Sequence, residues 1–359
     1  MTAFQKNISL PLPEPSAGIA AYEEELAACL ALSPAKQENY NRFRAARAVR
    51  SATVDYLPVK LDIENVSRCN FSCTMCAVST WRKGKRAADM TLECFKRLID
   101  EQIGLVEIKL NGLGEALMQG DDYFAMIRYA RERRIWVRMT TNASLLHIKD
   151  NAKKLIDSGV NEIDISVDGV DAMTFEGIRI GGHWKTVRDN CKRLNNMLRE
   201  RGRPSAKMWT LVQRANIHDI HRHVPLARLL GFKHAIFSTS LHGWANDALA
   251  RRNAAAEVGL TRQQVEFLIS QGQEHGVRVA FWDVADKFHA ANLCPWPFER
   301  AVVTSDSRTV ACCMIGDPDK HELGKGQSLL TAWTGEEYRA FRQSHIDGAI
   351  PQVCKGCYK

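Results

Sequence analysis

The chain has 359 residues, 45% of them hydrophobic and 25% charged, and a formal net charge of +8. This is the composition of a globular protein with room for one large domain and an appendage. It holds no apolar run long enough to span a membrane, and residues 1–7 lack the pattern of a signal peptide, so we expect a cytoplasmic protein without a membrane partner. The basic residues are spread rather than massed, which disfavours a nucleic-acid partner.

Residues 1–55 are predicted to form a helical extension that packs on the main domain. The proline-rich segment Pro11–Pro15 is a stiff spacer. Tyr22–Leu32 and Gln37–Val49 have helical patterns, and Pro34 separates them. No residue pattern that indicates chemistry lies in this extension.

A β/α alternation fills residues 56–288. Short apolar segments rich in β-branched residues are the predicted strands: Val59–Glu64, Val106–Leu110, Trp136–Thr140, Glu162–Val167, Met208–Val212 and Ala235–Thr239. Amphipathic stretches that follow these strands are predicted helices: Leu92–Gln102, Tyr123–Arg133, Ile148–Ser158, Lys185–Arg199 and Ile220–Leu230. A further helical pattern, Arg262–His275, leads to the apolar segment Val277–Trp282.

Strands that alternate with helices in this way predict an α/β fold. We expect a parallel sheet curled into a partial (β/α)6 barrel of the TIM type. In such folds the active-site residues lie on loops at the carboxyl ends of the strands, so those loops are where chemistry is expected.

The chain contains eleven cysteines, many for a protein expected in a reducing compartment, where metal binding explains them better than disulfides do. Two groups stand out: Cys69, Cys73 and Cys76 directly after the first predicted strand, and Cys294, Cys312, Cys354 and Cys357 near the end. The β/α rhythm stops before the second group. Residues 289–359 are therefore predicted to form a small Cys-rich domain.

The first group has the spacing C-x3-C-x2-C. Three thiolates on one tight loop suit three corners of an iron–sulfur cube and leave the fourth iron open. Half of a zinc site, with its fourth ligand elsewhere, is the alternative that the spacing leaves open.

This spacing resembles the cluster motif of the radical SAM enzymes. The resemblance implies a [4Fe–4S] cluster on Cys69, Cys73 and Cys76, with S-adenosylmethionine at the open iron. In that family the reduced cluster cleaves the sulfonium to a 5′-deoxyadenosyl radical, and the protein positions the cofactor and excludes side reactions.

The loops after four successive predicted strands resemble further motifs of the family. They imply contacts to S-adenosylmethionine or substrate from these residues: Gly112, Gly114, Glu115, Thr141, Asn142, Ser166, Asp168, Gln213 and Arg214. Ala116 stands where the family's Gly-Glu motif continues with proline, and Ala143 where glycine often follows Thr-Asn. Each match alone is also explained by the tendency of Ser, Asp and Asn to end strands. Together they support the resemblance over residues 56 to 285.

The second cysteine group resembles the auxiliary-cluster domains of the same superfamily, called SPASM in the long form and twitch in the short form. The resemblance implies a second [4Fe–4S] cluster on Cys294, Cys312, Cys354 and Cys357, whereas the ligand types alone also suit a zinc ribbon. Cys313 competes with Cys312, but neighbours in an extended strand face opposite ways, so one of the two is expected to ligate. The chain stops soon after Cys357, which resembles the one-cluster twitch form of deoxy-scyllo-inosamine dehydrogenase-type enzymes.

The expected function is that of a radical SAM oxidoreductase. It would abstract hydrogen from a sugar, cyclitol or similar small molecule, with the auxiliary cluster as electron acceptor and a donor such as flavodoxin or ferredoxin supplying electrons. The alternatives are a radical SAM enzyme that cross-links or epimerises a ribosomal peptide, a redox-neutral epimerase, and a non-catalytic iron–sulfur or zinc protein. Location alone makes His242, Asp283 and Arg300 candidates for a general base.

Overall fold

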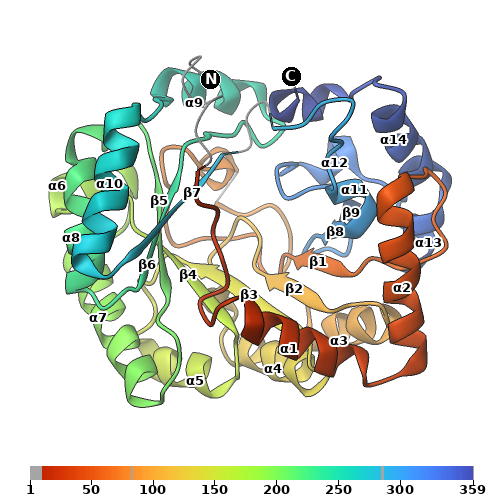
Figure 1. Ribbon diagram of the computed structural model, residues 1–359, viewed down its shortest axis with the longest axis horizontal. Coiled ribbons are helices and arrows are strands. Elements are labelled where there is room, and N and C mark those ends of the chain that lie inside the picture. The colour runs from red at the N-terminus through yellow and green to blue at the C-terminus, as the bar shows by residue number, and fades with distance from the viewer. Residues whose placement is uncertain (1–9, 82–83, 284–286, 359) are drawn as a thin grey trace.

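The computed structural model describes residues 10–81, 84–283 and 287–358 and has a nine-stranded sheet at its centre (Figure 1). The strands lie in the order β7-β6-β5-β4-β3-β2-β1-β8-β9. Every neighbouring pair is parallel except β8 and β9. The strands are β1 (Lys60–Ile63), β2 (Glu107–Leu110), β3 (Trp136–Thr141), β4 (Glu162–Ser166), β5 (Lys207–Leu211), β6 (His234–Ser238), β7 (Arg278–Trp282), β8 (Arg300–Val303) and β9 (Thr309–Val310).

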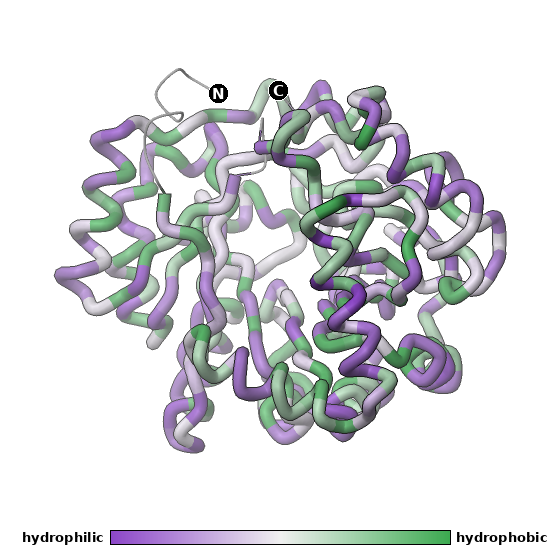
Figure 2. Tube along the Cα trace, turned by 45° about the vertical axis from the view of Figure 1, so that its right-hand side comes forward, coloured by the Kyte–Doolittle hydropathy of each residue, from purple (hydrophilic) through white to green (hydrophobic). Residues whose placement is uncertain are grey.

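Helices cover the outer face of the curled sheet, and several shorter ones follow near the C-terminus. The α-helices are α1 (Ile19–Leu30), α2 (Pro34–Val49), α3 (Leu92–Glu101), α4 (Asp121–Glu132), α5 (Asn151–Asp157), α6 (Ala172–Ile178), α7 (Trp184–Glu200), α8 (His223–Leu229), α9 (Asp247–Ala256), α10 (Arg262–His275), α11 (Trp296–Glu299), α12 (Pro318–His321), α13 (Leu329–Thr334) and α14 (Glu336–Ile346). The 3₁₀ helices are η2 (Ala77–Thr80), η4 (Ala116–Gln119), η5 (Ile148–Asp150), η6 (Ile217–Arg222) and η7 (Gln352–Cys357). In Figure 2 hydrophobic and hydrophilic residues alternate along the outer helices, as expected of helices with one face on a sheet. Within the described ranges, no helix is long and apolar enough to cross a membrane.

The predicted fold class is confirmed, because the strands predicted from the β/α alternation form the parallel part of the sheet. The prediction of one helix over Ile148–Ser158 is wrong in detail: Lys149 and Asp150 have φ of 47° and 59°, so α5 begins only at Asn151. Helices α6 and α9 were not predicted, since both are short and lie in loops at the carboxyl ends of strands.

The C-terminal segment also differs from expectation, because it continues the sheet. Strand β8 pairs in parallel with β1, with Arg300 opposite Lys60 and Val303 opposite Ile63. Residues 289–359 are thus joined to the barrel by backbone hydrogen bonds, and the boundary at residue 288 stays a prediction.

The described part of the N-terminal extension contains the helices α1 and α2, runs first along the edge strand β7 and then reaches the amino-terminal ends of β4 and β2. The carbonyl of Pro11 accepts a hydrogen bond from the Phe281 N–H at 2.8 Å, and the Ser16 N–H donates to Glu162 at 2.9 Å. Further on, the Tyr22 hydroxyl donates to Glu107 at 2.9 Å. The extension therefore covers the lower end of the barrel lumen, opposite the end where active-site loops are expected.

The lumen of the barrel is lined by charged side chains. In β2, Ile108 and Leu110 are fully buried against the helices, so the alternating Glu107 and Lys109 face inward. Buried ion pairs link neighbouring strands across this inner face: Lys60–Glu107, Arg138–Glu107, Arg138–Glu162, Arg138–Asp164, Lys207–Glu162, Arg300–Asp62 and Arg300–Glu107.

Arg300 is expected to be the most important member of this network for stability. Its guanidinium lies 2.7 Å from Asp62 and 3.2 Å from Glu107, and all three side chains are buried. Replacing it (Arg300→Met) leaves carboxylates without their counter-charge, which should lower the free energy of unfolding by about 3–5 kcal/mol.

The matched control is Arg278→Met. Arg278 pairs with Glu14 in a half-exposed ion pair, so its loss should cost about 1 kcal/mol or less. Anaerobic urea unfolding followed by far-UV circular dichroism gives both midpoints. Equal midpoints for the two variants would contradict the importance of the Arg300 pairs.

Candidate active site

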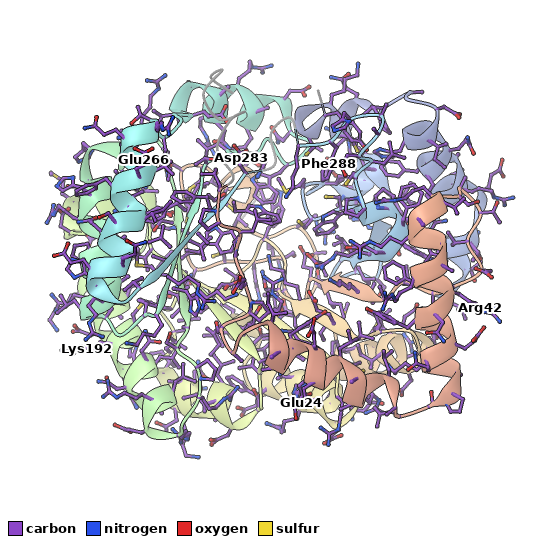
Figure 3. All side chains as sticks on the ribbon, viewed as in Figure 1. Glu24, Arg42, Lys192, Glu266, Asp283 and Phe288 are labelled. Atoms are coloured by element: carbon purple, nitrogen blue, oxygen red, sulfur yellow. The ribbon has the colours of Figure 1, made fainter. Side chains whose placement is uncertain are left out.

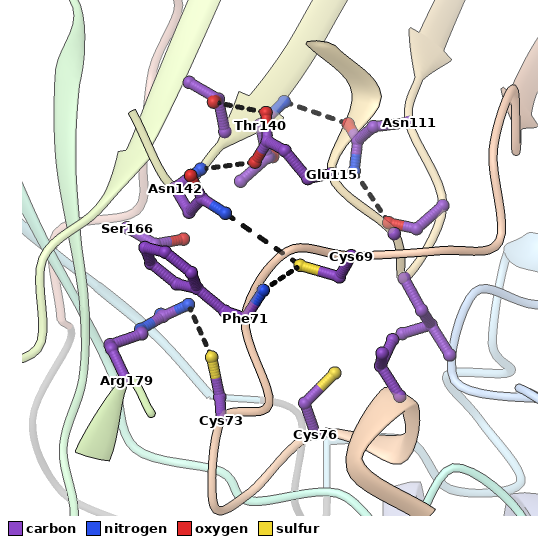
Figure 4. Close-up of a pocket in the computed structure, with 15 residues that line it drawn as sticks. Cys69, Phe71, Cys73, Cys76, Asn111, Glu115, Thr140, Asn142, Ser166 and Arg179 are labelled. Atoms are coloured by element: carbon purple, nitrogen blue, oxygen red, sulfur yellow. Dashed lines mark hydrogen bonds between the residues drawn. The ribbon is translucent and has the colours of Figure 1, made fainter. Parts of the chain in front are cut away.

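A pocket opens at the carboxyl ends of β1 to β4 (Figure 4). It brings together most of the residues that the strand-end motifs predict: Cys69, Cys73, Cys76, Gly112, Gly114, Glu115, Thr141, Asn142 and Ser166. It is also lined by residues that were not predicted: Phe71, Val78, Asn111, Leu113, Thr140 and Arg179. Four strand ends thus converge on one loop that carries three thiols.

Backbone contacts fix the cysteine loop in place. The N–H groups of Ser72 and Thr74 donate to Ile180 and Ile178 at 2.8 and 3.0 Å, which ties the loop to the end of α6. On its other side the Glu115 N–H donates to the carbonyl of Arg68 at 2.9 Å.

Gly114 is required by this close approach. A Cβ on Gly114 would lie 2.4 Å from the carbonyl oxygen of Arg68 and 2.5 Å from that of Val66. No side chain fits against two backbone oxygens at these distances. The glycine of the Gly-Glu motif therefore lets the loop after β2 pack directly against the loop after β1.

The three thiols have an environment that suits metal-bound thiolates. Burial raises the pKa of Cys69 to about 12 and that of Cys76 to about 11, and burial likewise raises the pKa of Cys73. Nitrogen donors point at two of these sulfurs: the Phe71 N–H lies 3.4 Å from Cys69 Sγ, and Arg179 Nη1 lies 3.8 Å from Cys73 Sγ. Buried thiolates need compensating positive charge, which iron supplies, so these residues fit an iron–sulfur cluster.

Glu115 is a buried hub that joins two of the strand ends. Its carboxylate accepts hydrogen bonds from Thr141 Oγ1 at 2.7 Å and from the Asn142 N–H at 2.8 Å. Burial raises the pKa of Glu115, and these two hydrogen bonds oppose that rise. The side chain of Asn142 then reaches Asn70 at 3.0 Å, so Glu115 positions the third strand end against the cysteine loop.

Arg179 is a pocket residue that sequence reasoning missed. It follows α6, and its Nε donates to Asp168 at 2.6 Å while Nη1 points at Cys73. The only sequence signal was the pair Gly181-Gly182 two residues after it, where an added Cβ would crowd Asn70 or Phe71. A guanidinium held in this way could bind an anionic group of a cofactor in the pocket.

Three predicted site residues do not line the pocket. Asp168 is fully buried and holds Arg179 and the Leu211 N–H, so it acts on the pocket through other residues. Gln213 is buried, and its Nε2 has no hydrogen-bond partner among the described residues. Arg214 is exposed and donates to the carbonyl of Ala255, away from the pocket.

The second cysteine group gathers beside β8 and β9. The thiols of Cys354 and Cys357 are close enough to Cys294 to raise its pKa further, after burial, to about 12. Cys312 in turn lies near Cys294. Within the described ranges, no three His, Cys, Asp or Glu side chains are arranged to hold a single metal ion. Four thiolates suit an iron–sulfur cube, which spreads its ligands over separate irons.

The prediction that Cys312 and Cys313 lie in an extended strand is wrong. Strand β9 ends at Val310, and the Ile315 N–H donates to the carbonyl of Cys312 at 3.0 Å, which closes a turn. The two thiols hydrogen-bond to each other instead of facing opposite ways. The choice between them as a ligand stays with the family pattern, which favours Cys312.

Cys313 reaches toward the lumen. Its pKa lies below the ordinary value, first because it hydrogen-bonds to Cys312 and further because Lys109 and Arg300 lie close to it. The second cysteine group therefore adjoins the inner face of the barrel.

The candidate bases differ in what they can do. Arg300 is engaged with two carboxylates, which outweigh its burial and raise its pKa, so it is no base. His242 has its pKa lowered to about 4 by burial, so its imidazole is neutral near pH 7 but is a weak base. Asp283 accepts a hydrogen bond from Ser240.

Comparison with known families identifies the class. Residues 64–224 match the model of the radical SAM superfamily, and residues 294–358 match the SPASM model, described as an iron–sulfur cluster-binding domain. The chain belongs to the radical SAM superfamily and carries a C-terminal SPASM domain. It is therefore a radical SAM enzyme with S-adenosylmethionine and two iron–sulfur clusters as cofactors.

Individual relatives share only parts of the chain. The PqqA peptide cyclase of Methylorubrum populi is 28% identical over 52% of this chain and 48% of its own length. The GTP 3′,8-cyclase of Aliarcobacter butzleri is 32% identical over 35% of this chain and 38% of its own. The chain thus spans half or less of these curated relatives.

Among solved structures, SuiB of Streptococcus suis bound to the precursor peptide SuiA has the same fold. Its TM-score is 0.63 at 13% identity, with 84% of this chain and 70% of that chain covered. At this identity the likeness concerns the fold alone.

Replacing Cys69, Cys73 and Cys76 together with Ala should abolish reductive cleavage of S-adenosylmethionine. The barrel has a large core of its own, so we expect it to stay folded and to lose about four of roughly eight irons per chain. Iron analysis and 5′-deoxyadenosine formation with dithionite measure both effects.

The control for this variant is Cys94→Ala, since Cys94 lies outside the pocket and contacts Ser307. It should keep its iron and its activity. Continued 5′-deoxyadenosine formation by the triple variant would show that the cluster is held elsewhere.

Proposed function

We propose that the protein is a radical SAM oxidoreductase that oxidises a small polar molecule, such as a sugar or cyclitol, bound in the barrel lumen. The observation that carries this proposal is the placement of two thiol groups next to a charged lumen: the pocket loop after β1, and the cysteines beside the neighbouring strand β8 and β9. One site for making a radical and one for taking up an electron suit a net oxidation.

The pocket residues would hold the first cluster and its cosubstrate. Cys69, Cys73 and Cys76 would ligate the iron, and the glycines at 112 and 114 let backbone atoms approach S-adenosylmethionine. Arg179 and Ser166 face the same pocket and would bind its carboxylate. When bound, cluster and cosubstrate supply a 5′-deoxyadenosyl radical that abstracts hydrogen.

The second thiol group would hold the auxiliary cluster through Cys294, Cys312, Cys354 and Cys357. With four cysteine ligands such a cluster offers one-electron acceptance rather than a binding site for substrate. A redox partner of the flavodoxin or ferredoxin type would deliver the electrons that start the reaction.

The proposed oxidation balances as follows for a secondary alcohol. A hydrogen atom leaves the carbon and forms the new C–H bond of 5′-deoxyadenosine. The hydroxyl proton passes to a base, one electron leaves to the auxiliary acceptor, and the C–O bond becomes a carbonyl.

The lining of the lumen supports a polar substrate. Ion-paired side chains on β1 to β5 and β8 form its inner face, and the N-terminal extension covers its lower end. Charged side chains beneath the pocket favour a molecule with several hydrogen-bonding groups over an apolar one.

Peptide modification is the second candidate. The match to a peptide cyclase over 52% of this chain favours it. A panel of sugars, cyclitols and short peptides, incubated anaerobically with S-adenosylmethionine and dithionite, separates the two, because the true substrate raises 5′-deoxyadenosine formation and changes mass. An oxidised peptide product would replace the small-molecule proposal.

Replacing Cys354 and Cys357 with Ala should separate the two halves of the reaction. The pocket thiols lie on another loop, so the variant is expected to cleave S-adenosylmethionine at more than about half the normal rate. It should form at least about tenfold less oxidised product, because the radical lacks an electron acceptor. Both products are quantified in one anaerobic reaction.

Full product formation by a variant shown to have lost about four irons would falsify the acceptor role. The net reaction would then be redox-neutral, as in an epimerase, and the second cluster would only stabilise the folded C-terminal domain.

A further inference from the structure

The floor of the pocket is formed by the next layer of lumen residues. Asn111, Thr140 and Ser166 line the pocket, and on each strand the side chain two residues earlier faces the same way, about 7 Å deeper. These deeper residues are Lys109, Arg138 and Asp164. The pairing register places Lys109 beside Arg138, and Thr140 beside Asp164.

Lys109 is a lumen cation without an anionic partner. Within residues 10–81, 84–283 and 287–358, its ammonium makes no ion pair and no hydrogen bond, although it is partly buried. The carboxylates nearest to it in register are engaged elsewhere: Asp62, its neighbour on β1, pairs with Arg300 at 2.7 Å. Glu107 on its own strand already faces Lys60, Arg138 and Arg300.

The other two floor residues differ: the Arg138 guanidinium is ion-paired, whereas one carboxylate oxygen of Asp164 has no hydrogen-bond donor among the described residues. Arg138 is committed to Glu107, Glu162 and Asp164. Asp164 is only 3% exposed, and its Oδ1 has no hydrogen-bond donor among the described residues. A buried carboxylate oxygen without a donor costs free energy unless a ligand or water supplies one.

Lys109 also lies on the side of the lumen that leads to β8, because the register places it beside Asp62 on β1 and places Asp62 beside Val302 on β8. A group held by this ammonium would sit between the two thiol groups. That is the place where a substrate must lie to meet the radical on one side and an electron acceptor on the other.

We propose that Lys109 binds an anionic group of the substrate, a carboxylate or a phosphate, and that Asp164 accepts a hydrogen bond from a hydroxyl group of the same molecule. This inference rests on the proposed function and narrows its substrate class to anionic sugars or cyclitols. A partly buried ammonium keeps its charge at lower cost when an anion pairs with it, and no carboxylate of the described residues forms an ion pair with Lys109.

Protection of Lys109 from acylation tests the proposal without turnover. The iron-loaded enzyme with S-adenosylmethionine and no reductant is treated with acetic anhydride, and the rate of Lys109 modification is read by peptide mass spectrometry. Glucose 6-phosphate, glucuronate and glucose are the probes. We expect one or both anionic probes to slow the modification at least about fivefold, and glucose to have little effect.

The experiment also distinguishes the two anions, because the degree to which glucose 6-phosphate and glucuronate each slow the modification of Lys109 shows whether the site prefers a phosphate or a carboxylate. Lys192, an exposed lysine on the outer face of α7, is the internal control and should react at the same rate throughout (Figure 3). Slowing by glucose as strong as that by the anions, or protection by none of the probes, overturns the proposal.

Variants check the roles of the two residues. By equilibrium dialysis, Lys109→Met should weaken binding of the protecting anion at least about tenfold, Lys109→Arg should restore most of it, and Lys192→Met should bind like the wild type. The Asp164→Asn variant should bind glucose 6-phosphate no more tightly than inorganic phosphate, because the hydrogen bond from the sugar hydroxyl is weakened. Unchanged anion binding by Lys109→Met contradicts the proposal.

The two hypotheses can fail separately. Binding that depends on Lys109, with no oxidised small molecule in the panel, would overturn the proposed oxidation and leave the anion site standing. An oxidised neutral sugar, with no protection of Lys109 by anions, would do the reverse.

Discussion

The parallel pairing of β8 with β1 is the constraint on which the rest of the molecule depends. It sets residues about 240 positions apart in register, Arg300 opposite Lys60, and so carries the second cysteine group to the edge of the barrel. The same pairing brings Arg300 onto Asp62 and Glu107, which ties the C-terminal segment to the charged lumen. Without this pairing, the second cysteine group would not be held at a fixed position relative to the first.

Electrostatics divides the inside of the barrel into two functional levels. At the lower level, ion pairs neutralise one another between strands, beneath the N-terminal extension. At the upper level lie the buried thiols and Arg179. Iron would compensate the charge of the thiolates, and an anionic group of a cofactor would pair with the guanidinium. Lys109 and Asp164 lie at the boundary, and the buried Oδ1 of Asp164, which has no hydrogen-bond donor among the described residues, is one reason to place the substrate there.

The class of chemistry and the substrate depend on different parts of the chain. The cysteine loop and the Gly-Glu turn are built from backbone contacts that admit little variation, as Gly114 shows. Lumen positions outside the ion-pair network, such as Lys109, face no such backbone constraint. A shared radical SAM domain therefore leaves open whether relatives act on peptides or nucleotides, and specificity must be sought in the lumen.

The sequence by itself determined what depends on local pattern: the β/α alternation, the spacing of Cys69, Cys73 and Cys76, and the polar strand ends that converge on one pocket. Hydrophobic period and ligand spacing act over a few residues, so they are readable without a structure. Only the tertiary structure decided which side chains are left over when distant strands pair. Contacts between segments far apart in the chain, which no local pattern encodes, decide the return of β8 to the sheet, the position of Arg179 and the place of Lys109 between β1 and β3.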